Sequence, residues 1–577
     1  MIAQRDERAP SRAAGGEGAL LASGRAACAA AAVAYALLTL AVLSPVVGRP
    51  TEVLPYHAML EPPFSDLDHH DQVFAMWEVS RNARVLTTRP WALGGPGQCF
   101  PMPRPHTLGE HAFGEGLLAA VPWALSRDPI LTYNVVIALT LWIPALAMFR
   151  LASYWTASAG AAFVAGALFA FQPARLIDPA HPFVHGDLWA PLVLLYGHRT
   201  FYDRRWRDAI ALGAFASLAL LESLYQIVAL ALVLVPYGIH LVVRFRRNLG
   251  AVLPKLALAL AMAGAVAFLV FAPYLATRAE FGILQGRGTF APPASDYVTP
   301  RKNAFVGVAL GVLALIGIAD RLRGRRVVHG DDPRLALLAG GLLVAWSAAA
   351  GVFVPIAGLW LRSPMRALAK VVPGLDAVRA LPIIRMGFTL VLALLAAYGV
   401  GALGERFRAR GRALVAAIAA AAIAVELAVP DASRWSFGKT LALAGWQARP
   451  PAPEVEFYRS LPDGAVLDLP YRPMAVGMMR DLAHDLLAAA YHQKPTAACY
   501  NSFSTPIQDR VRRFAYDLPP AVRDELHRLG FRTFVVHEEQ MTDAERARLA
   551  PVLADASRLT PIAESPPHRA YRLHPPE

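Results

Sequence analysis

Long apolar runs alternate with short polar connections over most of the chain. Runs of roughly 18 to 22 residues with few charges recur, and a helix of that length crosses the core of a bilayer. The first run, residues 25–47, is too long for the apolar part of a signal peptide and is expected to remain as a span. Ten further runs lie at about 129–150, 157–173, 188–201, 208–222, 224–243, 256–276, 304–319, 335–355, 383–403 and 411–429. The pattern predicts a mostly α-helical polytopic membrane protein with about eleven transmembrane helices.

Three polar segments complete the organisation. Residues 1–24 are small, polar and mixed in charge, and residues 48–128 are rich in Pro, Gly, His and acidic residues. Residues 431–577 carry more charge and more proline than the apolar part. We expect a tail at 1–24, a transmembrane domain at 25–430 that includes the loop 48–128, and a separate domain at 431–577.

The last of these segments has the pattern of an α/β domain. Short β-like runs lie at Ala465–Leu469, Thr533–His537 and Ala570–Leu573. Helical periodicity lies between them at Asp481–Tyr491 and Asp543–Leu553. The length of the segment 431–577 lies within the range of about 50–250 residues that is typical of a compact domain.

Arginine clusters between the apolar runs predict the orientation. They follow the fourth, sixth, eighth and tenth spans: Arg204, Arg205 and Arg207; Arg244, Arg246 and Arg247; Arg321, Arg323, Arg325 and Arg326; Arg406, Arg408, Arg410 and Arg412. With eleven spans all four clusters share the side of the N-terminus, which the positive-inside rule places in the cytoplasm. Residues 48–128 and 431–577 are then extracytoplasmic, and the bacterial inner membrane is the expected location.

Composition agrees with this assignment. Hydrophobic residues make up 55% of the chain and charged residues 17%, well below the charged fraction of soluble domains. The net charge of +13 would suggest nucleic acid in a soluble protein. Because the cations lie between apolar runs, topology and anionic lipid explain them, and no nucleic-acid partner is expected.

The three cysteines predict no disulfide framework. Cys28 lies in an apolar helix, whereas Cys99 and Cys499 both fall on the predicted outer side. These two can pair there, but their long separation and the absence of a C-x-x-C spacing disfavour a bond.

The acidic segment Ser65–Gln72 is the most informative stretch for chemistry. It holds Asp66, Asp68 and Asp71 together with His69 and His70, about twenty residues after the first span. A carboxylate near the membrane surface can act as a general base on a hydroxyl or coordinate a divalent cation. A solvated acidic turn that caps the following helix is the simpler explanation. The sequence leaves both open.

Other polar residues at membrane depth or on the outer side are candidates for substrate contacts. His181 and His185 have a spacing of four, but Pro182 argues against a regular helix and metal binding is disfavoured. The outer loop 357–382 is unexpectedly basic, either to hold a lipid phosphate or because Leu359–Val371 is an amphipathic surface helix. Glu222 is an intramembrane carboxyl near a span end. The candidate substrate-binding residues are His69, His70, Glu110, His181, His185, Asp187, Tyr225, Arg278, Arg379 and Arg385.

The layout resembles that of the GT-C glycosyltransferase superfamily, in the branch that includes YfhO-type proteins. One span, a large acidic outer loop, many further spans and an outer soluble domain follow in that order. Local segments are similar as well: Asp71–Trp77, Asp128–Asn134, Phe169–Arg175, Trp189–Leu192, and His492–Pro495 with Cys499–Ser502. The spread Asp66, Asp68 and Asp71 replaces the paired acidic residues of better-studied relatives.

The resemblance implies an inverting transfer of a hexose or pentose from a polyprenyl-phosphate donor to a glycan, lipid or protein acceptor outside the membrane. The acidic residue of the first outer loop is implied to be the base or a metal ligand. Carried over here, this is Asp71 first, then Asp68 and Asp66. Whether a divalent cation takes part stays open.

Two other function classes fit the same pattern. A transporter or flippase for lipid-linked glycans would use the basic outer loops to handle the headgroup. Such proteins often show inverted repeats with interrupted helices in matching positions, and this sequence shows no such symmetry. A non-catalytic assembly protein that keeps the fold is the third interpretation. In the 431–577 segment, His484, His492 and His537 have no recognisable triad context.

Overall fold

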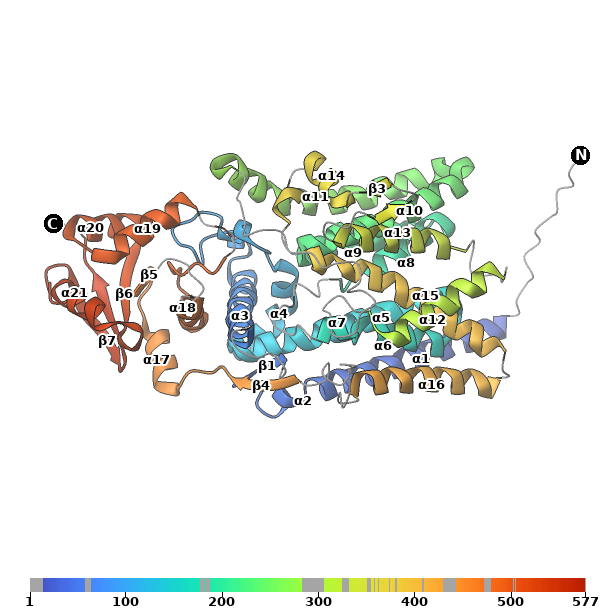
Figure 1. Cartoon of the computed structure of the whole chain (residues 1–577), viewed down its shortest axis with the longest axis horizontal. Helices are drawn as coiled ribbons and strands as arrows, with labels where there is room; N and C mark the ends of the chain where they lie inside the picture. The colour runs from blue at the N-terminus through green and yellow to red at the C-terminus, as the bar shows by residue number, and fades with distance from the viewer. Residues whose placement is uncertain are drawn as a thin grey trace, which may run out of the picture.

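The computed structural model describes residues 14–57, 64–176, 182, 187–282, 306–323, 332–349, 354–356, 359–361, 363–372, 374–378, 381–406, 409–428, 443–471, 479–501, 503 and 505–575. Its long helices lie side by side along the long axis of the molecule, and a smaller mixed unit formed by the C-terminal residues lies at one end (Figure 1). Helices α3 (Phe64–Thr88) and α4 (Phe113–Ser126) lie between these two parts.

A helix lies at each of the eleven apolar runs. These helices are α1 (Ala14–Val42), α5 (Pro129–Thr156), α6 (Ala159–Ala170), α8 (Ala190–Tyr202), α9 (Trp206–Glu222), α10 (Leu224–Phe245), α11 (Leu249–Phe281), α12 (Val308–Leu322), α13 (Arg334–Ala348), α15 (Met386–Glu405) and α16 (Ala409–Ala428). Four helical segments among the described residues are long and apolar enough to cross a membrane: Gly24–Val42, Pro129–Thr156, Leu224–Phe281 and Ile383–Glu405. The protein is therefore mostly helical with several membrane-length helices, while the count of eleven spans stays a prediction.

Close backbone approach holds the central helices together. Glycines at 317 on α12 and 399 on α15 face each other, since an added Cβ at Gly317 would lie 2.0 Å from the Leu395 oxygen and one at Gly399 would lie 2.1 Å from the Leu313 oxygen. Small residues let helix backbones approach in this way, and van der Waals packing then stabilises the pair. α15 is the most enclosed helix of the bundle, with nearly all its residues buried.

The basic loop 357–382 differs from one of its two predicted interpretations, an amphipathic helix over Leu359–Val371. Residues Val354–Ile356 (β2) and Leu359–Leu361 (β3) pair as an antiparallel hairpin, and a helix, α14, covers only Pro364–Val371. Ser363 and Pro364 begin this helix, with Pro364 at its first position, where proline has no N–H to lose. Arg366 and Lys370 on α14 are exposed.

The C-terminal unit contains a four-stranded sheet with the order β5-β6-β8-β7. β5 (Ala465–Leu469) runs parallel to β6 (Phe531–His537), while β8 (His568–Leu573) is antiparallel to β6 and to β7 (Leu559–Ser565). Helices α17 (Ala452–Ser460), α18 (Met479–His492), α19 (Pro506–Asp517), α20 (Pro520–Leu529) and α21 (Asp543–Leu553) complete it. The predicted strands at 465–469, 533–537 and 570–573 and both predicted helices coincide with β5, β6, β8, α18 and α21.

The described residues of 48–128, predicted as the first outer loop, contact the C-terminal unit at two places. β1 (Val53–His57) pairs antiparallel with β4 (Leu443–Gln447), and Arg449 donates to Asp128 at 2.8 Å at the start of α5. On the other side, α18 packs along α3. α3 is therefore enclosed by the bundle, by α4 and by the C-terminal unit.

Candidate functional site

α3 carries polar residues that contact the C-terminal unit and the β1–β4 pair. Asp71 lies near its beginning and is partly exposed, and the Tyr500 hydroxyl donates a 2.5 Å hydrogen bond to its Oδ1. The Tyr500 ring also stacks on Phe74, one turn along α3, with centroids 5.6 Å apart. A carboxylate that accepts a short hydrogen bond of this kind is held in one orientation.

The residues next to Asp71 attach α3 to the β1–β4 pair. Gln72 is buried, donates to the Pro55 oxygen at 2.5 Å and accepts from the Trp446 indole at 2.6 Å. His69 stacks on the same Trp446 ring with centroids 4.5 Å apart. His69, a candidate substrate contact from the sequence, therefore belongs to the packing that fixes the start of α3.

A set of four carboxyl groups lies where α3 and α4 meet the ends of α9 and α10. The members are Glu78 on α3, Glu110 in the loop before α4, Glu115 on α4 and Glu222 at the end of α9. Glu78, Glu115 and Glu222 are 5%, 1% and 1% exposed. An added Cβ at Gly114 would lie 2.8 Å from Cγ of Glu222, so glycine at this position lets α4 approach the end of α9. We call these residues the carboxyl set.

Burial decides the protonation of the outer-loop members of the carboxyl set. It raises the pKa of Glu78 to about 8, and Arg81 acts in the opposite direction. Burial also raises the pKa of Glu115 well above its ordinary value, with Glu110 and Glu78 adding to the rise. Neither carboxyl oxygen of Glu115 has a hydrogen-bond partner from another residue in the described part of the chain. Clusters of perturbed, desolvated carboxyls of this type are characteristic of functional sites.

Glu110 combines burial with contacts to a helix N-terminus. Its Oε2 accepts from the backbone N–H of Leu224 at 2.9 Å, at the first residue of α10. Burial raises the pKa of Glu110 to about 7, while the N–H groups of Leu224 and Tyr225 and the Ser223 side chain lower it. Glu110 thus satisfies free N–H groups at the start of α10, where negative charge is favourable. The interaction brings two sequence candidates, Glu110 and Tyr225, together.

Arg81 and Tyr274 fix the loop that surrounds the carboxyl set. Arg81 is buried and donates to the backbone oxygens of Leu93 at 2.5 Å and Gly95 at 2.7 Å. The Tyr274 hydroxyl, from α11, donates to the backbone oxygens of Gly109 and His106 at 2.8 and 3.1 Å. Arg81 therefore joins the segment 93–95 to α3, and Tyr274 joins the segment before Glu110 to α11.

Other candidate residues from the sequence either lie outside the described part of the chain or form ion pairs. His181, His185 and Arg379 lie outside the described residues, and so do the side chains of Asp66 and Asp68, although both positions belong to α3. Asp187 accepts from the buried guanidinium of Arg175 at 2.5 Å. Arg278 forms a two-pronged ion pair with Asp376 at 2.7 and 2.9 Å.

Arg385 is buried where α15 begins, beside the start of α10. Gln226, in the first turn of α10, donates to the Ile383 oxygen at 3.2 Å and joins the two helix ends. The structure thus brings Arg385, Glu110 and Tyr225 to one region of the bundle. Asp71 and His69 lie near the beginning of α3, where they contact Tyr500 and Trp446.

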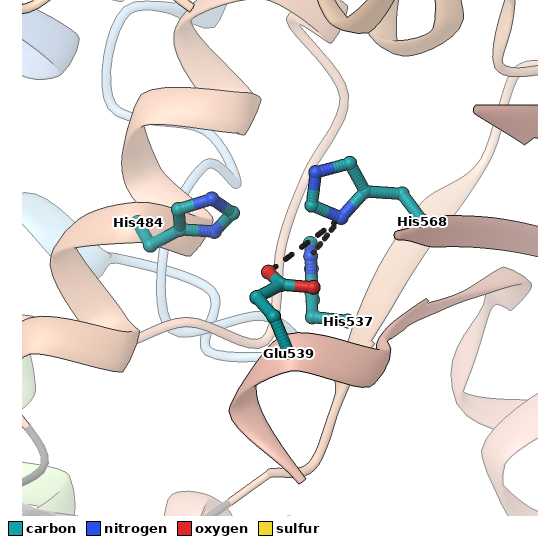
Figure 2. A group of neighbouring side chains, drawn as sticks. All are labelled: His484, His537, Glu539 and His568. Carbon is teal, nitrogen blue, oxygen red and sulfur yellow. Dashed lines mark hydrogen bonds and ion pairs between the residues drawn. The ribbon is translucent and has the colours of Figure 1, made fainter. Parts of the chain in front are cut away.

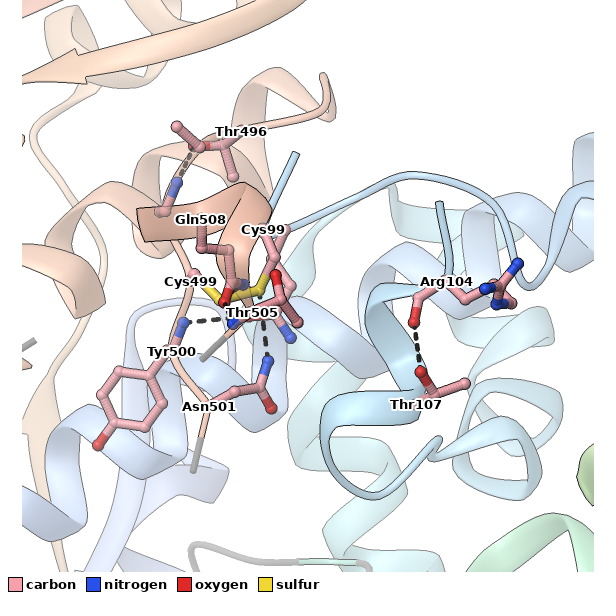
Figure 3. Close-up of a disulfide and its surroundings, with 12 residues drawn as sticks. Cys99, Arg104, Thr107, Thr496, Cys499, Tyr500, Asn501, Thr505 and Gln508 are labelled. Carbon is pink, nitrogen blue, oxygen red and sulfur yellow. Dashed lines mark hydrogen bonds between the residues drawn. A yellow bond between two sulfur atoms is a disulfide. The ribbon is translucent and has the colours of Figure 1, made fainter. Parts of the chain in front are cut away.

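Contrary to the expectation from their spacing, Cys99 and Cys499 form a disulfide (Figure 3). The segments around them pair as well: Cys99 donates to the Ala498 oxygen at 2.8 Å, Phe100 to the Thr496 oxygen at 2.9 Å, and Thr496 to the Gly97 oxygen at 2.9 Å. The expectation was wrong because folding brings together segments that are 400 residues apart in sequence. The bond joins the first outer loop to the C-terminal unit, just before the Tyr500 that contacts Asp71.

Two members of the carboxyl set were not identified from the sequence. Glu78 lies seven residues after Asp71, a spacing that returns to the same helix face, and this signal was available. Glu115 lies in an otherwise apolar helix, where a lone carboxyl is unusual. Their proximity to Glu222 depends on tertiary packing alone.

No family model and no curated protein matches the chain. Among solved structures, the chain is similar to the crystal structure of ArnT from Cupriavidus metallidurans in the apo state. The match covers 94% of this chain and 98% of that chain, with 14% sequence identity and a TM-score of 0.39.

Proposed function

We propose that this protein is a membrane glycosyltransferase of the GT-C type that transfers a sugar from a polyprenyl-phosphate donor to an extracytoplasmic acceptor. The observation that carries the proposal is the carboxyl set, together with Asp71 on the same outer-loop helix. These groups lie where membrane-length helices meet water-exposed segments. A lipid-linked sugar and a polar acceptor can meet only at such a boundary.

Asp71 is the proposed general base. The carboxyl groups of Glu78 and Glu115 are buried, so an acceptor hydroxyl cannot reach them. Glu110 is partly exposed but accepts hydrogen bonds at the start of α10. Asp71 is partly exposed, and the Tyr500 hydroxyl orients its carboxylate. It is the described outer-loop carboxylate best placed to take a proton from an acceptor hydroxyl as the new glycosidic bond forms.

The departing polyprenyl phosphate requires positive charge. Arg385 is the proposed contact, because it is buried at the bundle end beside the first turn of α10. A guanidinium binds phosphate oxygens through two parallel N–H groups. Arg278 is a second candidate, and its guanidinium forms an ion pair with Asp376. A divalent cation bound by the Asp66–Asp71 segment would supply further charge, and this part of the earlier hypothesis stays a prediction.

The proposed orientation has the outer loop and the C-terminal unit outside the inner membrane and the N-terminus in the cytoplasm. The ends of α9 and α11 and the start of α5 contact the outer loop or the C-terminal unit, through Glu222, through the Arg104–Glu280 ion pair and through Asp128. The arginine-rich ends of α8 and α10 are therefore at the opposite end of the bundle. The Cys99–Cys499 bond supports this orientation, since disulfides persist in oxidising compartments.

Envelope glycan analysis tests the proposal. Cells that lack the protein are complemented with wild type or with Asp71→Asn, Asp68→Asn or Asp66→Asn at matched membrane levels, and surface glycans and lipid-linked sugars are profiled by mass spectrometry. We expect a glycan modification to disappear without the protein and Asp71→Asn to fail to restore it. Asp543→Asn, an exposed carboxyl on α21, is the matched control.

Two outcomes would reject the proposal. If all three Asn variants restore the modification fully, the acidic segment is a solvated turn and assembly without catalysis becomes the better interpretation. If purified protein in vesicles moves the lipid-linked sugar between leaflets without transferring it, the protein is a flippase. In that case the buried carboxyls would belong to a transport path.

A further inference from the structure

Three histidines and a glutamate converge in the C-terminal unit, away from the carboxyl set. His484 lies on α18, His537 ends β6, Glu539 lies in the 3₁₀ turn Glu538–Gln540, and His568 begins β8. Each offers a ligand atom, and these atoms lie within 4.8 Å of one another. Figure 2 shows the four side chains directed toward a common point. The sequence alone placed no chemistry on these histidines.

Strand register brings the two buried imidazoles together. β6 and β8 are antiparallel, and His537 is directly opposite His568. Opposite residues project from the same face of a sheet. The two Nδ1 atoms are 3.1 Å apart, and Oε1 of Glu539 is 3.7 Å from Nδ1 of His568. Tetrahedral Zn²⁺ with Zn–N distances of about 2.0–2.1 Å places its ligand atoms roughly 3.3–3.4 Å apart, between these two values.

The outward-facing nitrogens of the same rings contact carboxylates. Nε2 of His537 is 3.0 Å from Oδ1 of Asp468, a residue of β5 that is 1% exposed. Nε2 of His568 is 3.5 Å from Oε1 of Glu454 on α17. If each Nε2 carries the proton and donates to its carboxylate, both Nδ1 lone pairs point toward the shared centre. Metal-binding histidines usually have a second nitrogen bonded to a carboxylate in this way, which fixes the tautomer.

His484 and Glu539 complete the set of four. The side-chain amide of Gln540 contacts Nδ1 of His484 at 3.1 Å. The amide nitrogen of Gln540 faces Nδ1, so in this orientation Nδ1 accepts and Nε2 carries the proton, 3.9 Å from Oε1 of Glu454. Flipping the amide exchanges its nitrogen and oxygen, lets Nδ1–H donate and leaves the Nε2 lone pair of His484 for an ion. Glu539 is 38% exposed and supplies a negative charge on the solvent side. Three imidazoles and a carboxylate form a closed set of the ligand types that zinc prefers.

We propose that His484, His537, Glu539 and His568 bind one Zn²⁺ ion that stabilises the C-terminal unit. The ion would join α18 to the end of β6 and the start of β8. α18 also packs along α3. This inference does not depend on the proposed glycosyl transfer, because the ligands are all in the C-terminal unit and bear no relation to the carboxyl set.

Zinc titration of the full-length protein in detergent tests the site. The protein is stripped with a chelator, reloaded with ZnCl₂ and assayed by inductively coupled plasma mass spectrometry and thermal unfolding. We expect about one zinc ion per chain, a higher Tm with zinc, and metal–ligand distances of about 2.0–2.1 Å in X-ray absorption spectra. His568→Gln and Glu539→Gln should weaken binding at least tenfold, and Asp468→Asn should weaken it about 10- to 100-fold.

His527→Gln and Glu564→Gln are matched controls, because these residues lie in the same unit outside the cluster. Both should bind zinc as wild type does. Glu539→Gln keeps the test valid if the buried His568→Gln variant fails to fold, since Glu539 is partly exposed. The proposal is overturned if wild type binds no more zinc than His568→Gln. It is also overturned if Glu539→Gln and His568→Gln bind zinc with unchanged affinity, in which case the histidines form a hydrogen-bonded network only.

Discussion

The hydroxyl of Tyr500 donates a 2.5 Å hydrogen bond to Oδ1 of Asp71, although 429 positions separate the two residues in the sequence. Asp71 belongs to the outer-loop helix that follows the first apolar run, and Tyr500 belongs to the C-terminal unit next to the Cys99–Cys499 bond. The C-terminal unit therefore orients the carboxylate that we propose as the base. The expected role of the C-terminal unit is to position the Asp71 side chain.

Tyr500→Phe tests this relationship. Removing the hydroxyl leaves the ring stacked on Phe74 but removes a hydrogen bond that orients the Asp71 carboxylate. We expect a partial loss of the glycan modification, smaller than the roughly 10²- to 10⁴-fold loss for Asp71→Asn that removal of a general base produces. Quantitative glycan profiling at matched protein levels measures both. Equal activity of Tyr500→Phe and wild type would show that the contact has no functional role.

Glu78→Gln tests the buried carboxyl set through pH-dependent stability. Burial raises the pKa of Glu78 from 4.5 to about 8 in the folded protein. The folded state therefore holds this proton more tightly than the unfolded state, and stability is lost as pH rises from about 4.5 through 8. We expect Glu78→Gln to raise Tm relative to wild type at pH 8.5 and to change it little at pH 4.5. Thermal unfolding in detergent across this range is the measurement, and a pH-independent difference would contradict the assignment.

The disulfide can be tested without an activity assay. In protein alkylated before reduction, only Cys28 should react, and Cys99 and Cys499 should become labelled after reduction. The double variant Cys99→Ser/Cys499→Ser should lower the free energy of unfolding by about 2–5 kcal/mol, because the bond restricts the unfolded chain. Peptide mass spectrometry and chemical denaturation provide the two readouts. Labelling of all three cysteines in membranes prepared without reductant would contradict the pairing and the proposed outer location.

Asp187→Asn distinguishes a structural carboxylate from a substrate contact. Asp187 and Arg175 form an ion pair with 5% and 0% side-chain exposure. Removing one charge from a buried pair leaves the other uncompensated and costs about 3–5 kcal/mol. We expect Asp187→Asn to unfold at lower temperature. Arg175→Met combined with Asp187→Asn should recover part of the loss, whereas a pure substrate contact would lower activity at unchanged Tm.

Local patterns predicted some elements well. β5 and α21 have the predicted bounds, because a short apolar run (Ala465–Leu469) and a capping box at Thr542 and Glu545 are signals within a few residues of each other. The loop 357–382 was predicted less well, since the pairing of β3 with β2 depends on cross-strand contacts. Asp71 was a candidate from the sequence, but its Tyr500 partner was not.

The sequence by itself determined the membrane-protein class, the position of the apolar helices and the α/β character of the C-terminal unit. Each of these depends on periodicity or composition within one segment, where hydrophobic burial acts locally. Tertiary structure alone decided that Cys99 meets Cys499, that Glu78, Glu115 and Glu222 share one interior, and that His537 faces His568. These contacts join segments far apart in the chain. Strand register and helix packing set their geometry, and neither is encoded in the spacing of the residues involved.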